Sequence, residues 1–369
     1  MIQTGTPEEA GLSRTRLERA YGLLAGWVEA GRIPGAAIQV TKQGVWMPAM
    51  GFGRMAPASD APPLPPDAIF LVASVTKPLA CLATVMLVER GLIALDQPAH
   101  EIVPEFQGKG KEEVRVVHLL THTSGLPDMV PANLELRKQH AGLDVFLRHV
   151  CDCDLLFKPG ASVSYQSAGI AMLGEIVRRV DGTSLPDFLD REVFGPLGMR
   201  DTSLGLKEAM RPRLAAVRLP EDQAGTDWNW NTDYWLKLAV PWGGMLSTVQ
   251  DITVLMRMFL NGGAFGEARI IGTATARRMV TNHVAAMPEV PAATKLTHAW
   301  GLGWHLGTLT ASRNYGDLVS PRTFGHSGAT GTVVWADPEM DLTCAVFTTQ
   351  PGVGRELGLL SNAVAAAVV

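Results

Sequence analysis

Apolar positions in the first part of the chain follow two different periods. Between residues 13 and 31 they recur every three or four positions, which predicts an amphipathic helix with Ser13 as its N-cap. Residues 36–40 and 45–47 are short apolar runs on either side of a Gln43-Gly44 turn, and they predict two strands. A proline-rich linker over residues 56–66 follows them.

The middle of the chain is patterned mainly for helices, and the end returns to strands. Helices are predicted at residues 114–120, 143–150, 167–180, 184–194 and 248–260, with long loops between them. Beyond residue 299 the pattern predicts strands at residues 300–306, 322–326, 332–336 and 342–348. The apolar stretch over residues 357–369 predicts a final helix that packs on a sheet.

This order of elements indicates a discontinuous α/β domain, made of residues 1–65 and 295–369. Residues 66–294 are predicted to form an inserted, mainly helical domain that carries the substrate-pocket loops. A chain of 369 residues is long enough for two such units. Because clefts between domains are common catalytic sites, we expect the active site at their junction.

The stretch Ser74-Val75-Thr76-Lys77 enters a long apolar run that predicts a buried helix. Residues three apart share a helix face, so the Ser74 hydroxyl and the Lys77 amine would lie side by side. A serine needs a neighbouring base to become a nucleophile, and a partly buried lysine can have its pKa lowered enough to serve. The alternative is an N-cap serine with a solvated lysine one turn further on.

Pro78 helps to place the start of this helix, because proline is tolerated only in the first turn. The helix is therefore expected to begin close to Ser74 or Val75. Ser74 would then lie among the free backbone N–H groups of the helix N-terminus, at the positive end of the dipole. An acyl-transfer site needs such donors for its oxyanion.

Composition and charge exclude several other classes of protein. The net charge of −4 gives no reason to expect nucleic acid or an anionic membrane as a partner. No apolar segment reaches the length that spans a bilayer, and the N-terminus lacks the pattern of a secretory signal, so a cytoplasmic protein is expected. The four cysteines have no zinc spacing and are expected to be reduced.

Two further groups of residues complete a possible catalytic set. Tyr165, in Tyr165-Gln166-Ser167, lies at a loop-to-helix junction, where its phenol would serve as general base and acid if a nearby ammonium lowered its pKa. His326-Ser327-Gly328-Ala329 ends a strand, and the Ala329 N–H would pair with that of Ser74 as an oxyanion hole. The alternatives are a tyrosine packed at a helix start and a glycine-rich turn with a hydrogen-bonded histidine.

The order Ser-x-x-Lys, Tyr-x-Ser, His-Ser-Gly resembles that of the serine β-lactamase and penicillin-binding-protein superfamily. Further segments resemble its class C β-lactamase-related branch, and they are residues 121–127 (THTSGLP), 194–199 (FGPLGM) and 243–248 (GGMLST). The resemblance implies a β-lactamase-like fold, in which helices flank an antiparallel sheet and the site lies in a cleft beside a helical domain. It also implies roles for Ser74, Lys77 and Tyr165 in catalysis, and for Ser167, His326, Ser327 and Gly328 in substrate binding.

Two departures from the family pattern point towards its esterase branch. Ser167 stands where many β-lactamases have asparagine, and His326 stands where class C enzymes have a lysine that holds the substrate carboxylate. A neutral histidine would hold a carboxylate less well. The chain is therefore most similar to the family VIII carboxylesterases and related acyltransferases. It has no Gly-x-Ser-x-Gly elbow of the α/β-hydrolase type.

The inserted region also contains a cluster of aromatic residues. A site with several aromatic side chains suits an apolar acyl or aryl group. For each residue alone, packing in the core is the alternative. The cluster consists of Trp228, Trp230, Tyr234, Trp235 and Trp242.

The sequence therefore predicts a serine hydrolase that acts on short-to-medium acyl or aryl esters through a Ser74 acyl-enzyme. Lys77 and Tyr165 would share the proton transfers, and no metal or organic cofactor is required. The expected partner is a small-molecule ester. The alternatives are a β-lactamase, a D-amino-acid peptidase or an acyltransferase with the same site, and a non-catalytic binding module.

Overall fold

The computed structural model describes residues 2–307 and 315–369 of the chain. Its main sheet has eight strands, of which β1 and β3 pair in parallel and all other neighbours are antiparallel. The strands in order are β1 (Gln3–Thr4), β3 (Val45–Trp46), β2 (Gly35–Lys42), β13 (Leu342–Thr348), β12 (Thr332–Asp337), β11 (Phe324–Gly328) and β10 (His305–Leu306), while β4 (Met50–Gly53) also pairs with β2.

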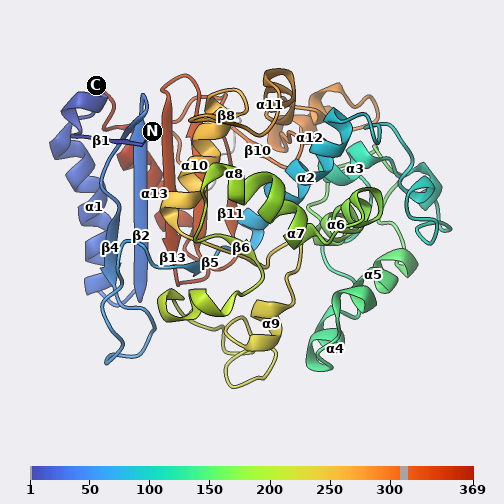
Figure 1. The fold of residues 1–369 in the computed structure, drawn as a ribbon, viewed down its shortest axis with the longest axis horizontal. Coiled ribbons are helices and arrows are strands. Elements are labelled where there is room, and N and C mark those ends of the chain that lie inside the picture. Colours follow the sequence, from blue (N-terminus) through green and yellow to red (C-terminus); the bar gives the residue numbers. More distant parts are fainter. Residues whose placement is uncertain (1, 308–314) are drawn as a thin grey trace.

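The two ends of the chain meet in the centre of this sheet (Figure 1). Strand β2 pairs with β13 along its whole length, from Ala36 opposite Thr348 to Lys42 opposite Leu342. The predicted β-lactamase-like architecture, with helices around a mostly antiparallel sheet, is confirmed. The pairing explains how residues near both ends of the sequence form one unit.

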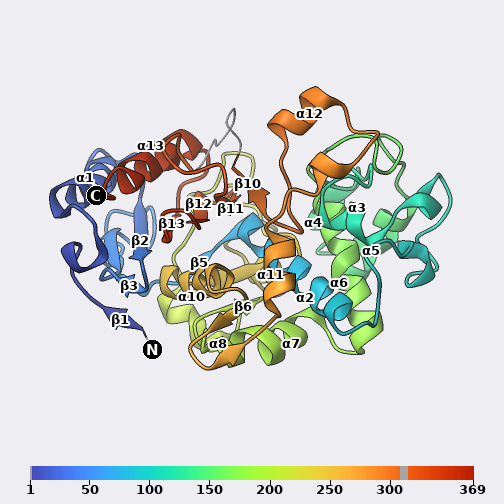
Figure 2. The same cartoon turned by 90° about the horizontal axis from the view of Figure 1, so that it is seen from above.

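Strand residues alternate between the two faces of the sheet, and each face has its own helical cover. Ile38 and Val333 belong to a core formed with α1 (Arg14–Glu29) and α13 (Gly354–Ala365). Ala37 and Val334, their neighbours in sequence, belong to the larger core on the other face. There α10 (Val249–Leu260) packs against β2, β12 and β13. Figure 2 shows this layering from above.

Most of the remaining helices gather beside the sheet, and α3, α5 and α6 lie on the right of Figures 1 and 2. Two small sheets accompany them, β5-β7-β6 and β8-β9. The strands are β5 (Phe70–Leu71), β6 (Ser203–Leu204), β7 (Met245–Ser247), β8 (Ala264–Phe265) and β9 (Ala268–Arg269). The helices are α2 (Lys77–Glu89), α3 (Val116–Leu120), α4 (Asn133–Lys138), α5 (Leu143–Asp152), α6 (Ser167–Asp181), α7 (Leu185–Leu189), α8 (Gly195–Leu197), α9 (Asp233–Lys237), α11 (Thr273–Met279) and α12 (Ala292–Thr297).

The longer predicted elements are confirmed, and the differences occur at short ones. The single helix predicted at residues 184–194 is α7 followed by a π-helical turn over Asp190–Phe194. The strand predicted at residues 300–306 is reduced to β10, with an isolated bridge from Trp300 to His305. Short helices such as α4 and α12, and the β5-β7-β6 sheet, were not predicted, because stretches of two to six residues carry little periodicity.

The domain limits at residues 65 and 295 remain a prediction. Helix α10 falls inside the segment predicted as the helical domain, although it packs against the main sheet. Assignment of this helix therefore depends on how the boundary is defined.

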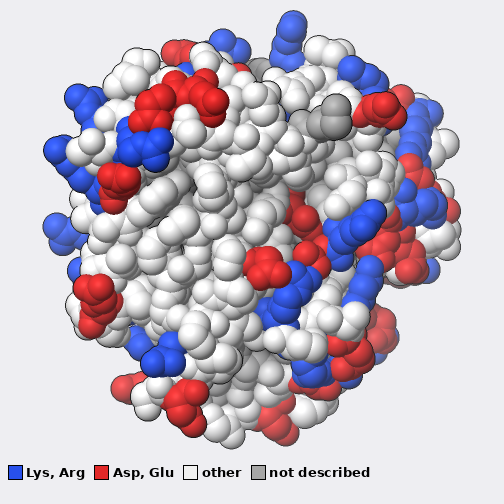
Figure 3. All heavy atoms as spheres, turned by 60° about the vertical axis from the view of Figure 1, so that its left-hand side comes forward, with Lys and Arg blue, Asp and Glu red and all other residues white. Residues whose placement is uncertain are grey.

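The surface is mixed in charge, as the net charge of −4 suggests. On the face shown in Figure 3, acidic and basic side chains lie close to one another around a broad area that carries neither. Within residues 2–307 and 315–369, no helix is both long and apolar enough to cross a bilayer. All four cysteines are unpaired, as expected.

Candidate active site

Ser74 lies in a 3-10 turn, Ala73–Thr76, between β5 and α2. The α-helix begins only at Lys77, so the prediction that it starts at Ser74 or Val75 is wrong by one turn, although Pro78 does lie in its first turn. The difference follows from Ala73, whose φ of +46° places it in the left-handed region. Such a conformation costs free energy for a non-glycine residue and turns the chain sharply before Ser74.

Neighbouring strands hold the Ser74 turn in place. The Thr330 hydroxyl donates to the Leu71 carbonyl at 2.7 Å, and the Thr332 hydroxyl donates to the Val72 carbonyl at 2.9 Å. Gly328 approaches the same backbone so closely that a Cβ at this position would lie 2.2 Å from the Val72 oxygen. The glycine of the third motif is therefore required because the end of β11 packs directly against the serine turn.

Lys77 is buried beneath Ser74. Its Nζ lies 2.9 Å from Ser74 Oγ and 2.9 Å from the Trp242 carbonyl oxygen, and only 1% of the residue is exposed. Burial lowers the pKa of Lys77 to about 7, although the negative charge of Asp128 opposes this shift. A neutral amine has two N–H donors and one lone pair. It can donate to Trp242 and accept the Ser74 proton without moving.

Tyr165 precedes α6 and lies over Lys77. The Lys77 Nζ is 4.7 Å from the centre of the phenol ring. Burial raises the pKa of Tyr165, and the neighbouring Ser74 hydroxyl only partly offsets that effect. The sequence analysis required a nearby ammonium to lower the pKa of Tyr165. That requirement is not met, because the Lys77 nitrogen lies over the face of the phenol ring. The phenol stays protonated.

Ser167 does not face an open pocket but binds Asp128. Both its backbone N–H and its hydroxyl donate to Asp128 Oδ1, at 3.0 and 2.7 Å. The Asp128 carbonyl accepts the N–H groups of Ser167 and Ala168, so this residue also caps the start of α6. Ser167 is 4% exposed, whereas Asp128 is exposed to solvent.

His326, the first residue of the third motif, is neutral. It is 3% exposed, and its Nδ1 donates to the Ser327 carbonyl at 2.8 Å, which leaves a lone pair on Nε2. Burial, and then the charge of Lys77, lower the pKa of His326 to about 3. Nε2 is buried without a hydrogen-bond partner among the described residues. The ring lies 6.1 Å from that of Tyr165.

Ala329 follows β11 in an exposed turn. In the described part of the chain its backbone N–H donates to no other group. Since β11 contacts the Ser74 turn through Gly328, this free N–H belongs to the same local region as Ser74. The arrangement suits the predicted oxyanion hole.

Comparison with known proteins gives the family of this chain. The family model described as Beta-lactamase matches residues 21–368. The chain belongs to the β-lactamase family. The predicted resemblance to the serine β-lactamase and penicillin-binding-protein superfamily is therefore confirmed, and the protein is a serine hydrolase of this family.

Individual relatives of this β-lactamase-family protein carry different names. A Salmonella agona protein, provisionally named a D-alanyl-D-alanine carboxypeptidase, is 25% identical over 95% of this chain and 86% of its own. A family VIII carboxylesterase of known structure has a TM-score of 0.77 and 23% identity over 97% of this chain and 99% of its own. The hydrolase EstCE1 has a TM-score of 0.76 and 22% identity over 95% and 99% of the two chains. At this identity the two structures show the shared fold alone.

The aromatic cluster of this family member is organised around a cation. The Arg137 guanidinium lies 4.8 Å from the Trp228 ring and 4.4 Å from the Trp235 ring. Tyr234 stacks on His140 at 4.5 Å. These contacts show packing of α4 and the residues just after it against α9 and the segment before it. The predicted substrate-binding role of these residues stays a prediction.

Two other members of the cluster occupy different environments. Trp242 lies nearer the reaction centre: its carbonyl binds Lys77, and its side chain lines a small cavity with Ser167. Trp230 packs, partly buried, against the main core.

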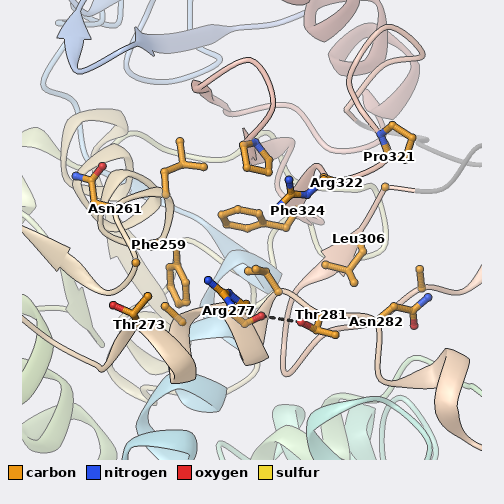
Figure 4. Close-up of a pocket in the computed structure, with 17 residues that line it drawn as sticks. Phe259, Asn261, Thr273, Arg277, Thr281, Asn282, Leu306, Pro321, Arg322 and Phe324 are labelled. Carbon is orange, nitrogen blue, oxygen red and sulfur yellow. Dashed lines mark hydrogen bonds between the residues drawn. The ribbon is translucent and has the colours of Figure 1, made fainter.

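A separate cavity of about 750 Å³ lies beside the start of β11 (Figure 4). Phe259, Arg277, Arg322 and Phe324 are among its lining residues. The described lining contains neither Ser74 nor any other residue of the predicted catalytic set. His326 lies in the middle of β11 and Gly328 at its far end, and neither lines this cavity, which is therefore distinct from the candidate active site.

Sequence reasoning missed two residues next to the reaction centre. Asp128 directly follows the recognised 121–127 segment, and His122 lies within it. His122 accepts the Gln166 N–H on Nδ1 at 3.1 Å, and its ring contacts Tyr165 and Trp300 at 4.7 and 4.2 Å. An imidazole within a recognised segment and a carboxylate directly after it were an available signal, but only the fold shows that both contact the second motif.

Proposed function

We propose that this serine hydrolase is a carboxylesterase for short-to-medium acyl or aryl esters. The observation that carries the proposal is the Lys77 amine, buried 2.9 Å from Ser74 Oγ with a pKa of about 7. An amine of this pKa is about half neutral at pH 7, and its neutral form can take a proton from a serine. The hydrolysis then needs neither a histidine base nor a bound cofactor.

The proposed reaction has two halves that use the same groups. Ser74 Oγ attacks the ester carbonyl while its proton passes to Lys77, and the backbone N–H groups of Ser74 and Ala329 stabilise the oxyanion. Tyr165, still protonated and close to Ser74, passes its proton to the leaving alkoxide and takes the proton held by Lys77 in return. Water then attacks the acyl-enzyme with the same residues in reverse order. Lys77 is thus the base and Tyr165 the proton carrier.

The choice of ester over lactam or peptide rests on the third motif. His326 is uncharged and offers an acceptor rather than a cation to the substrate. Penicillins and peptides that end in D-alanine carry a carboxylate, which such a group does not stabilise. Relatives titled as a family VIII carboxylesterase and as a hydrolase with promiscuous acyltransferase activity add support.

The test compares p-nitrophenyl butyrate with nitrocefin and with an acyl-D-Ala-D-Ala peptide. We expect kcat/KM for the ester to exceed that for the other two. Ser74→Ala should remove essentially all ester turnover and leave the thermal unfolding temperature and circular dichroism spectrum close to those of the wild type. Faster turnover of nitrocefin, or of the peptide, would replace the esterase proposal with the corresponding activity. Substantial turnover by Ser74→Ala would disprove the nucleophile.

A further inference from the structure

We infer that the cleft selects substrates by charge: it favours esters that carry a cationic group and disfavours esters that carry a carboxylate, with Asp128 as the specificity-determining residue. The inference rests on the proposed esterase activity and deepens it by naming a substrate class. It follows from where the charged groups around the reaction centre lie and from which of them a substrate can reach.

Lys77, His326 and His122, the basic groups closest to Tyr165, offer no free cation to a substrate carboxylate. Lys77 is 1% exposed, and its amine is already hydrogen-bonded to Ser74 Oγ and to the Trp242 carbonyl. His326 and His122 are buried, and burial keeps both imidazoles neutral at physiological pH.

The arginines described above either bind other side chains or line the separate cavity. Arg137 is held between Trp228 and Trp235 and donates to the Trp228 carbonyl. Arg277 and Arg322 line the separate cavity of Figure 4. A carboxylate entering the site therefore loses its hydration without gaining an ion pair.

Asp128, in contrast, is an anion that a substrate can reach. Its Oδ1 is fixed by the N–H and the hydroxyl of Ser167, whereas its Oδ2 takes no hydrogen bond from the described residues. The residue is exposed to solvent. Because it binds Ser167, two residues after Tyr165, Asp128 lies beside the second motif, and its charge acts on Lys77 and Tyr165. A fixed carboxylate with one free oxygen is a suitable partner for a substrate cation.

A purely structural role for Asp128 is the competing explanation. Its backbone carbonyl caps α6 through Ser167 and Ala168, and this contact needs no side-chain charge. Asp128→Asn keeps that carbonyl and an amide oxygen that can still accept from Ser167, but it removes the negative charge. The variant therefore separates charge selection from helix capping.

The test measures kcat/KM for ester pairs that have nearly the same shape and differ in charge. The first pair is the p-nitrophenyl esters of 4-(trimethylammonio)butyrate and 5,5-dimethylhexanoate, which places the charge in the acyl part. The second is butyrylcholine and 3,3-dimethylbutyl butyrate, which places it in the alcohol part. The mono-p-nitrophenyl ester of adipate and its methyl ester provide the anionic comparison. Asp60→Asn is the matched control, because Asp60 is an exposed carboxylate in the loop after β4.

We expect the cationic ester to exceed its neutral isostere by about tenfold in at least one pair, and the adipate monoester to fall about tenfold below its methyl ester, since one partly solvated charge contact is worth about 1.4 kcal/mol. Asp128→Asn should bring the cationic ratios close to one and should only partly relieve the penalty on the adipate monoester, because it adds no cation to the site. Asp60→Asn should leave all the ratios unchanged. Equal rates within both cationic pairs, or cationic ratios that survive Asp128→Asn, would overturn the inference.

Binding of charged arylboronic acids tests the inference without turnover, because boron captures a reactive serine directly. The 3-(trimethylammonio)phenyl derivative should bind more tightly than the 3-carboxyphenyl derivative, and Asp128→Asn should remove most of the difference. If the wild type cleaves none of the esters yet shows this preference, the esterase proposal fails and the charge selection stands. If the esters are cleaved and both boronic acids bind equally, the reverse holds.

Discussion

At the scale of single residues, the site depends on burial more than on the identity of its groups. Lys77 has a pKa of about 7 because its amine is removed from water, and His326 is neutral for the same reason. Tyr165 is shifted in the opposite direction, which keeps its proton in place. One physical effect thus prepares a base, an uncharged acceptor and an acid within a single cleft.

The pKa of Lys77 predicts the pH dependence of ester hydrolysis. Because this pKa is lowered, the amine is protonated and inactive below about pH 7 and becomes neutral above it. The value of kcat/KM for a neutral ester should therefore rise with pH, with a midpoint near 7, and then level off, since Tyr165 keeps its proton. Because the guanidinium of arginine stays charged, Lys77→Arg should abolish the rise of kcat/KM near pH 7 together with most of the activity. A profile that is flat from pH 5 to 9 would contradict Lys77 as the base.

At the scale of elements, the serine turn is held from outside its own segment. Thr330 and Thr332, which lie at or near the start of β12, bind the carbonyls of residues 71 and 72, and the end of β11 packs against the turn through Gly328. The first and third motifs are thus one packed unit, although about 250 residues separate them in the sequence. A change in one motif is expected to disturb the other.

Gly328→Ala tests this packing. The new Cβ would lie 2.2 Å from the Val72 oxygen, so either β11 or the serine turn must shift. We expect a loss of about 1–3 kcal/mol in the free energy of unfolding and a fall in kcat of at least tenfold, because the oxyanion donors move apart. Gly22→Ala is the control: Gly22 lies within α1 with open space around its Cβ position, and alanine there should stabilise by about 0.5–1 kcal/mol. Thermal unfolding and ester kinetics on both variants decide the matter.

At the scale of the whole molecule, the main sheet separates two cores with different tasks. One face supports the catalytic turn and the helical region, and the other carries α1 and α13. In the second core, Trp335 Nε1 donates a buried hydrogen bond to Ser361 Oγ at 3.0 Å, which joins β12 to α13. Stability and catalysis should therefore be separable by mutation.

Leu360→Ala probes the core remote from the site. Leu360 is completely buried in α13, so its truncation should lower the free energy of unfolding by about 2–5 kcal/mol. The value of kcat of the folded fraction at 25 °C, normalised to active-site titration with a fluorophosphonate, should stay within about twofold of the wild type. A large drop in normalised kcat would show that the two faces are coupled.

The sequence by itself determined the order of the elements and the choice of the proposed reacting residues. Short apolar runs beside turns identified the long strands, helical periodicity identified the long helices, and three ordered motifs indicated the family. These features are local, or they depend on residue type alone, so a linear pattern can carry them. The Ser74-x-x-Lys77 spacing already implied that the two side chains meet, and they do, at 2.9 Å.

Only the tertiary structure decided which groups are charged and which already bind another side chain. Ser167 was expected to face a substrate but is bound to Asp128, and Arg137 lies between tryptophans that were expected to form a pocket wall. The proton states of Lys77, Tyr165 and His326 likewise depend on burial by segments distant in sequence. Desolvation and hydrogen-bond competition are sums over neighbours in space, and the linear order of residues does not specify those neighbours.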